Sequence, residues 1–154
     1  MQPKRASESC TEQVQILFSA DMNGAKRLFG GKLMAWIDVV AAVTARRHSG
    51  KNVSTAYVDS VQFLGAAYAD DTLVLRGCVT YTGNTSMEVK VETYVEELDG
   101  TKRMVNTAYV VLVALDEMEK PTPVPPLLIE TEEERKLWEE AKKRCALRKE
   151  MRAK

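Results

Sequence analysis

Apolar side chains recur along this chain with two different periods, and the periods predict its elements. Between Lys32 and Arg47 there is neither Gly nor Pro, and largely apolar positions are spaced three and four apart: Leu33, Trp36, Ile37, Val40, Ala41 and Thr44. This spacing predicts one long amphipathic helix, which ends at the basic residues Arg46 and Arg47, His48 and then Gly50.

Alternation with a period of two predicts strands. A short first strand is expected around Val14 to Phe18, and four more follow the helix, at Ser54 to Phe63, Thr72 to Tyr81, Ser86 to Leu98 and Lys102 to Asp116. In the segment that begins at Ser86, one face is apolar, and we expect the other face, which includes Glu88, to lie mostly in water. The Asp99–Gly100 step predicts a hairpin turn.

The last part of the chain changes character. Four prolines between Lys120 and Leu128 predict an extended linker, because proline fits neither a helix interior nor a strand ladder. Thr131 and Glu134 form a capping box, which predicts a C-terminal helix. We therefore expect a flexible lead (1–11), one domain (12–119), a linker (120–130) and a helix (131–154). The element order predicts an α+β fold in which about five antiparallel strands curl round the long helix.

Composition and charge limit the function. The 154 residues include 22 Lys and Arg against 22 Asp and Glu, so no overall field favours nucleic acid or an anionic membrane. No apolar run approaches the roughly 20 residues of a membrane span, so we expect no membrane insertion. Cys10, Cys78 and Cys145 are far apart and contain no Cys-x-x-Cys pair. We expect no disulfide framework, no zinc site and a reducing, cytoplasmic location.

Asp38 is the first candidate for chemistry, because it is the only ionisable residue between Leu33 and Ala45. A carboxylate on an apolar helix either loses water, which shifts carboxyl pKa values towards a range useful for acid–base catalysis, or lies at the exposed edge of the helix. Gly30 and Gly31 begin the helix, where free N–H groups suit an oxyanion. The alternative for these glycines is a tight turn.

Other candidates are less distinctive. Asn23 fits a contact to a carbonyl or water, or a turn residue. His48 is the single histidine, which excludes a metal site with several His ligands, and we expect a helix cap or a ligand contact. The basic cluster from Lys142 to Lys154 suits phosphates or forms a solvated helix end. The usual signatures of nucleophilic hydrolases, phosphate loops and zinc proteases do not occur in the sequence.

Four strings in this order carry a family resemblance. They are DMNGAKRLFGGKLMAWIDVVAAVTARRH (21–48), STAYVDSVQF (54–63), YTGNTSMEV (81–89) and VALDEMEKPTPVP (113–125). Together they resemble the hotdog-fold acyl-CoA thioesterases, in particular the cytosolic bacterial acyl-CoA hydrolases, over about Glu12 to Pro126. The chain departs from the family pattern at Lys26, where relatives usually carry Gly, at Asn84, where many carry Arg, and in the turn at 64–71.

The resemblance implies hydrolysis of acyl-CoA thioesters, with Asp38 as the general base or, alternatively, as a nucleophile that forms an anhydride. Asn23 of a second subunit would orient the water or carbonyl, and the N–H near Gly31 would polarise the thioester oxygen. The residues that the resemblance assigns to coenzyme A are Ala56, Tyr57, Val58, Thr85, Ser86 and Met87, with Arg144 for a CoA phosphate. We expect no metal and no separate cofactor, because coenzyme A belongs to the substrate.

The resemblance also implies partners. We expect a homo-oligomer, a dimer at least and a trimer of dimers (a hexamer) as the larger form, with no nucleic acid bound. Two other functions stay open at this point. One is a non-catalytic acyl-CoA-binding regulator in which Asp38 completes the dimer interface. The other is a hotdog hydratase or dehydratase, which usually relies on a His, and here only His48 is present.

Overall fold

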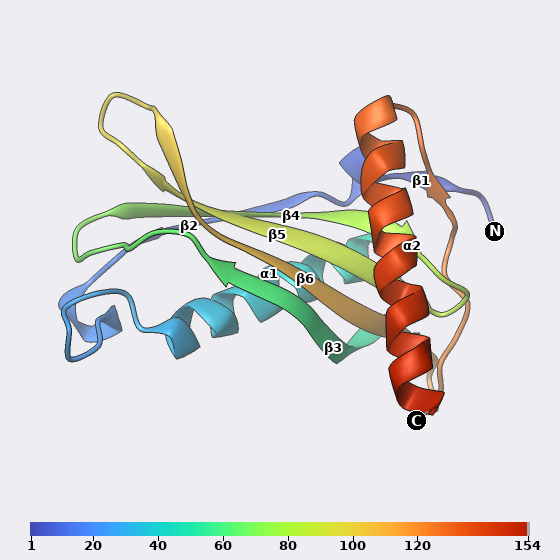
Figure 1. Ribbon diagram of the computed structural model, residues 1–154. Helices are drawn as coiled ribbons and strands as arrows, with labels where there is room; N and C mark the ends of the chain where they lie inside the picture. Colours follow the sequence, from blue (N-terminus) through green and yellow to red (C-terminus); the bar gives the residue numbers. More distant parts are fainter. Residues whose placement is uncertain (154) are drawn as a thin grey trace.

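The computed structural model describes residues 1–153 and shows a long helix, α1, lying against one antiparallel sheet (Figure 1). The helix spans Gly30–Ser49. The sheet has the strand order β2-β4-β5-β6-β3. Its strands are β2 (Thr11–Ile16), β3 (Asn52–Phe63), β4 (Thr72–Thr82), β5 (Ser86–Glu96) and β6 (Lys102–Leu115). The predicted α+β fold, with a five-stranded sheet round one long helix, is confirmed.

A stripe of small and branched side chains packs α1 against the sheet. Ile37, Val40 and Ala41 are fully buried. The close approach depends on Gly77 of β4, because a Cβ there would lie 2.8 Å from a methyl carbon of Val40 and 3.0 Å from the hydroxyl of Thr44. Asp38 directly follows Ile37, so the same packing leaves it at the margin of the buried stripe.

The helix ends where the sequence predicts. Gly50 adopts a left-handed conformation with φ of 68°, and its N–H donates to the carbonyl of Arg46. A residue with a Cβ is disfavoured at such an angle, which explains the glycine. The predicted hairpin turn is also present, and the Asp99 carboxylate accepts hydrogen bonds from the N–H and the hydroxyl of Thr101.

A second long helix, α2 (Glu132–Ala153), crosses the outer face of the sheet, on the side opposite α1 (Figure 1). It begins at the predicted capping box, in which the Thr131 hydroxyl accepts a hydrogen bond from the N–H of Glu134. Trp138 of α2 packs on Tyr81 of β4, with 5.1 Å between the ring centroids. The expectation that Glu88 lies in water is wrong, because α2 covers this part of the outer face and Glu88 is only 1% exposed.

The beginning of the chain meets the proline-rich segment. β1 (Lys4–Arg5) pairs in parallel with β7 (Leu127–Leu128), and the N–H of Lys4 donates to the carbonyl of Pro126. We expected a flexible lead and an unpaired linker here. Neither dipeptide has a strand pattern of its own, and each finds a partner only because the fold brings the two segments together.

The first strand of the sheet presents its apolar side outwards. Val14, Ile16 and Phe18 are exposed, whereas Leu17 is buried. In the pairing with β4, Val14 lies opposite Val74 and Gln15 opposite Leu73. The half-buried side chains on the α1 side of β2 are therefore Gln13 and Gln15, and alternation alone does not reveal which face of the strand is covered.

Cys10 and Cys78 form a disulfide, so the expectation of no such bond is wrong. Thr11 pairs with Gly77 in the antiparallel ladder of β2 and β4. The two cysteines therefore lie directly opposite each other, with 4.5 Å between their Cα atoms. The two cysteines are 68 residues apart, and their contact could not be predicted because the sequence does not show that β2 pairs with β4. The third cysteine, Cys145, is a free thiol.

His48 lies inside the fold near the end of α1. It is fully buried, and its Nε2 lies 2.8 Å from the carbonyl oxygen of Pro125. The histidine thus joins α1 to the proline-rich segment rather than facing a ligand. Burial lowers the pKa of His48 below its usual value of 6.5, an effect that the nearby Lys4 strengthens and the hydrogen bond to Pro125 opposes.

Within residues 1–153, no helix is long and apolar enough to cross a membrane.

The burial of His48 predicts that the stability of the fold depends on pH. The unfolded chain has the usual His pKa of 6.5, so below that pH it binds more protons than the folded chain, and the free energy of unfolding falls. In His48→Gln, the side-chain amide keeps a donor for Pro125 but does not titrate. We expect a shallower loss between about pH 7.5 and about pH 5.5 in the variant, measured by urea unfolding. An identical loss in both proteins would contradict the assignment.

Candidate active site

α1 presents the carboxylate of Asp38 to β3 at the edge of the sheet. The Thr55 hydroxyl donates to Oδ1 of Asp38 at 2.7 Å. Asp38 is exposed in the single copy, so the exposed-edge interpretation describes the isolated chain. Among residues 1–153, Thr55 is the only hydrogen-bond donor to this carboxylate, which leaves Oδ2 open to a water molecule.

Thr55 is not among the residues predicted from the sequence, because a β-bulge changes the direction in which its side chain points. Thr55 pairs with Leu112, and Tyr57 pairs with the next residue of β6, Val111, so Ala56 is an extra residue in β3. In a regular strand, residues two apart share a face. Here Leu112 points into the core, so Thr55 faces α1, while Tyr57 faces the outer side. Bulges often turn a side chain towards an active site in this way.

Asn23 lies in the turn before α1, and one of the two polar atoms of its side chain already forms hydrogen bonds within that turn. Its Oδ1 accepts hydrogen bonds from the N–H groups of Ala25 at 2.9 Å and Arg27 at 3.2 Å. Because both neighbours are donors, this atom is the carbonyl oxygen of the amide. The Nδ2 group is therefore the part of Asn23 that is left to act on a ligand, and it can only donate.

The same turn explains the departure at Lys26. Its φ of 62° lies in the left-handed region, which glycine adopts without steric cost. Lys26 therefore occupies a backbone position that suits the Gly expected there from the family resemblance. Its N–H donates to the carbonyl of Asn23, so the Lys preserves the turn.

Asp21 fixes this turn to the start of α1, a role that sequence analysis did not identify. One carboxylate oxygen accepts a hydrogen bond from the N–H of Phe18, and the other lies 3.5 Å from the Lys32 ammonium. The backbone carbonyl of Asp21 accepts the N–H of Phe29. The side chain is only 10% exposed, so these contacts are partly shielded from water.

Gly31 lies in the first turn of α1, where N–H groups have no partner within the helix. A Cβ on Gly31 would lie 2.7 Å from the ring of Phe29, so only glycine lets this ring fold over the helix start. Asp38 follows seven residues later, about 10 Å along the axis. Within one chain, the predicted oxyanion donor at Gly31 is therefore too far from the predicted base, Asp38, for both to act on the same carbonyl group.

Asn23 and Asp38, two of the candidate catalytic residues, also do not line the same cavity. Asn23 lines a cavity of about 390 Å³ together with Leu33, Phe63 and Val105, and Asp38 is not part of its wall in the described chain. A larger cavity of about 600 Å³ lies on the outer face beside the Cys10–Cys78 disulfide, and the walls mix basic and acidic side chains. We prefer the Asp38 region as the site, because the larger cavity contains none of the candidate catalytic groups.

The residues assigned to coenzyme A occupy different environments. Ala56, Tyr57 and Val58 are exposed on edge strand β3. Thr85, in the turn before β5, and Ser86, the first residue of β5, are half-buried. Met87 is fully buried in the core, so it can meet a ligand only through its backbone.

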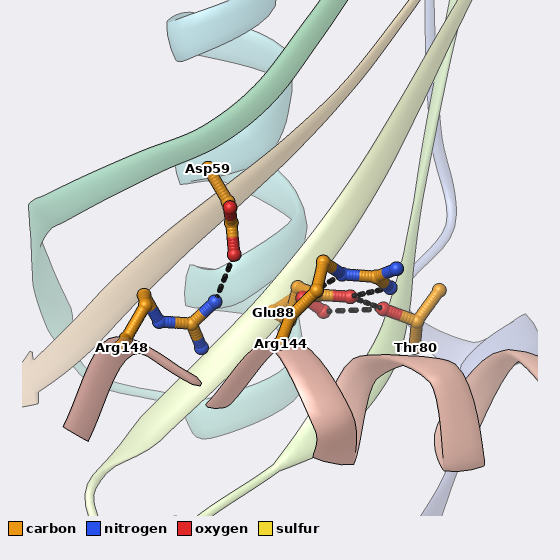
Figure 2. A network of polar contacts seen from close by, with 5 residues as sticks. All are labelled: Asp59, Thr80, Glu88, Arg144 and Arg148. Atoms are coloured by element: carbon orange, nitrogen blue, oxygen red, sulfur yellow. Dashed lines mark hydrogen bonds and ion pairs between the residues drawn. The ribbon is translucent and has the colours of Figure 1, made fainter. Parts of the chain in front are cut away.

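Arg144, assigned to a phosphate, is engaged in an ion pair (Figure 2). Its Nε and Nη2 bind the two carboxylate oxygens of Glu88 at 3.0 and 2.9 Å, and the guanidinium stacks 3.8 Å from the centroid of the Tyr109 ring. Burial alone lowers the pKa of Arg144, but the hydrogen bonds and charge of Glu88 outweigh it and raise the pKa. We interpret Arg144 as an anchor of α2 on the sheet.

Potential metal ligands do not gather in this structure. Residues 1–153 contain no group of three or more His, Cys, Asp or Glu side chains arranged to hold a metal ion. The candidate residues instead supply one oriented carboxylate at Asp38 and, away from it in the same chain, N–H donors at the start of α1 and an amide donor on Asn23. These groups suit acid–base attack on a carbonyl.

Comparison with known proteins agrees with this chemistry. An uncharacterized acyl-CoA thioester hydrolase of Bacillus subtilis is 41% identical over 92% of this chain and 83% of its own length. A cytosolic acyl coenzyme A thioester hydrolase of Rattus norvegicus is 32% identical over 93% of this chain, which spans 38% of that relative. A solved apo-hexameric acyl-CoA thioesterase superposes with a TM-score of 0.94 at 40% identity, covering 99% of both chains. The profile of the Thioesterase superfamily matches residues 25–101, and the chain belongs to that family.

Proposed function

We propose that this protein hydrolyses acyl-CoA thioesters to a carboxylic acid and free coenzyme A. The observation that carries the proposal is the Asp38 carboxylate, held through one oxygen by Thr55 and open to water at the other. The names of the relatives and the family match support the same reaction. Coenzyme A enters as part of the substrate, and no separate cofactor is needed for this chemistry.

In the proposed mechanism, Asp38 takes a proton from a water molecule as that water attacks the thioester carbonyl. The carbonyl oxygen becomes negative and accepts hydrogen bonds from the free N–H near Gly31 and from Nδ2 of Asn23. The tetrahedral intermediate then breaks its C–S bond. CoA leaves as a thiolate and receives the proton held by Asp38, so that charge and protons balance.

We further propose that two copies complete each site. The sheet edge beside Asp38 is apolar and uncovered: Val39 of α1 is 53% exposed and Val58 of β3 is 40% exposed, and Tyr57, on the outer side of the same edge strand, is 41% exposed. Large apolar groups grouped at a sheet edge favour an interface. A second copy on this surface would bring its own Asn23 turn towards Asp38 and overcome their separation within one chain. The hexameric relative supports extension to a trimer of dimers.

We also propose a cytoplasmic location, which the cytosolic rat relative supports. Thiols are kept reduced in that compartment. The Cys10–Cys78 disulfide would be unusual in that compartment, where such bonds are rare. The fold does not need the bond for its register, because the β2–β4 ladder already places the two residues opposite each other.

Asp38→Asn tests the base directly. The amide keeps the size and can still accept the Thr55 hydrogen bond, but it cannot take a proton from water. We expect kcat to fall by about two orders of magnitude or more, while binding of coenzyme A is retained. The measurement is release of free CoA thiol from acyl-CoAs of graded chain length, with wild type alongside. If wild type binds CoA but hydrolyses none of them, the protein is a binding regulator.

Asn23 separates a role in the turn from a role in catalysis. In Asn23→Asp, the side chain still accepts from Ala25 and Arg27 but has no Nδ2 donor. In Asn23→Ala, both functions are lost. We expect kcat to fall about a hundredfold in both variants, with only the Ala variant losing about 1 kcal/mol of stability. Kinetics and thermal unfolding measure the two effects. An Asp variant with wild-type turnover would refute the donor role.

A further inference from the structure

The C-terminal half of α2 contacts β3, an edge strand of the sheet, through Arg148. Its guanidinium forms an ion pair with the Asp59 carboxylate of β3 (Figure 2). The same guanidinium lies 5.6 Å from the centroid of the Tyr57 ring. The Arg148 side chain is 10% exposed and that of Asp59 is 22% exposed. Because these charges are largely removed from water, the pair is oriented more firmly than a surface ion pair.

The residues that Arg148 contacts coincide with two irregularities in β3. The pairing of β3 with β6 shifts between Thr55 and Tyr57, and again between Val58 and Ser60. Tyr57 lies between the two bulges, and Asp59 is the extra residue of the second. Arg148 therefore holds the bulged segment from the outer face, while Thr55 binds Asp38 on the inner face.

The first bulge links these two contacts. It alone allows Thr55 and Tyr57, two residues apart, to point to opposite faces of the sheet. If the bulge relaxed into regular alternation, Thr55 and Tyr57 would face the same side, and the hydrogen bond to Asp38 or the contact with Arg148 would be lost. The conformation of β3 near Ala56 is thus fixed from both sides.

A second ion pair fixes α2 on the sheet. Arg144, one helical turn before Arg148, binds both oxygens of the buried Glu88 of β5. The Thr80 hydroxyl donates to the same carboxylate at 2.7 Å. Figure 2 shows the two arginines of α2 reaching neighbouring parts of the sheet. The helix is thereby anchored on the sheet independently of its contact with β3.

We propose that Arg148 is a positioning residue for the hydrolytic site: through Asp59 and Tyr57 it maintains the bulges of β3 that aim Thr55 at Asp38. This inference rests on the proposed function for its kinetic consequences. The structural part, that Arg148 sets the local conformation of β3, stands apart from any activity. The partners of Arg148 are Asp59 and Tyr57, and Asp38 is not among them in the described chain.

A double-mutant cycle tests the proposal. The variants are Arg148→Gln, Thr55→Val and the double variant, with Arg152→Gln as the matched control, because Arg152 is an exposed arginine one turn further along α2. We expect Arg148→Gln to lower kcat by about ten- to a hundredfold with little change in KM. Arg148→Lys, which restores the charge, should recover part of the loss, and Arg152→Gln should match wild type.

The double variant decides between positioning and general support. If Arg148 acts through Thr55, adding Arg148→Gln to Thr55→Val costs little further activity. Additive losses in kcat would overturn the proposal and leave Arg148 as a structural contact only. Should Arg148→Gln fail to fold, Asp59→Asn removes the same ion pair from the strand side and takes its place in the cycle.

Amide hydrogen exchange supplies a readout that needs no turnover. We expect faster exchange at residues 54–60 in Arg148→Gln than in wild type or Arg152→Gln, with β5 unchanged. Unchanged exchange in β3 would overturn the proposal even if kcat fell. If wild type hydrolyses no acyl-CoA but exchange in β3 rises as expected, the proposed function fails while the control of β3 by Arg148 stands.

Discussion

The packing of α1 against the concave sheet is the constraint on which the rest of the structure depends. Val40 and Thr44 come so close to β4 that only the missing Cβ of Gly77 makes room for them. This contact fixes both the rotation and the depth of the helix. With Ile37 buried, Asp38 must lie at the margin of the contact, beside the edge strand β3. A surface carboxylate is thereby given one defined neighbour, Thr55, and one open side.

Much of this fold can be predicted from the sequence. The helix can be predicted because its buried positions repeat at helical spacing and because basic residues and Gly50 mark its end. Asp38 can be predicted as a candidate because the residues around it in the helix are uncharged. Glu88 shows the opposite case. Its alternation in β5 correctly assigns it to the outer face, but nothing in β5 indicates that α2 covers that face and buries the carboxylate against Arg144.

Features that arise from pairing between distant segments could not be predicted. Thr55 faces Asp38 only because a bulge reverses the alternation of β3, and a bulge leaves no periodic signal. Cys10 meets Cys78 because of the β2–β4 register. The basic cluster near the C-terminus is visible in the sequence, but the partners of Arg144 and Arg148 are not. In each case, the missing information is the position of a second strand or helix.

The proposed site requires two copies of the chain. Helix geometry keeps Gly31 away from Asp38 of the same chain, and Asn23 lines a cavity that does not include Asp38. Subunit complementation tests this claim most directly. Asp38→Asn and Asn23→Ala, each nearly inactive alone, are unfolded together, refolded as a mixture and assayed for release of CoA thiol. If each site combines the two residues from different subunits, random mixing restores one intact site in every mixed dimer, and about a quarter of wild-type activity returns. If both residues act within one chain, no intact site can form. A mixture that contains mixed dimers and stays as inactive as its parents would contradict the account.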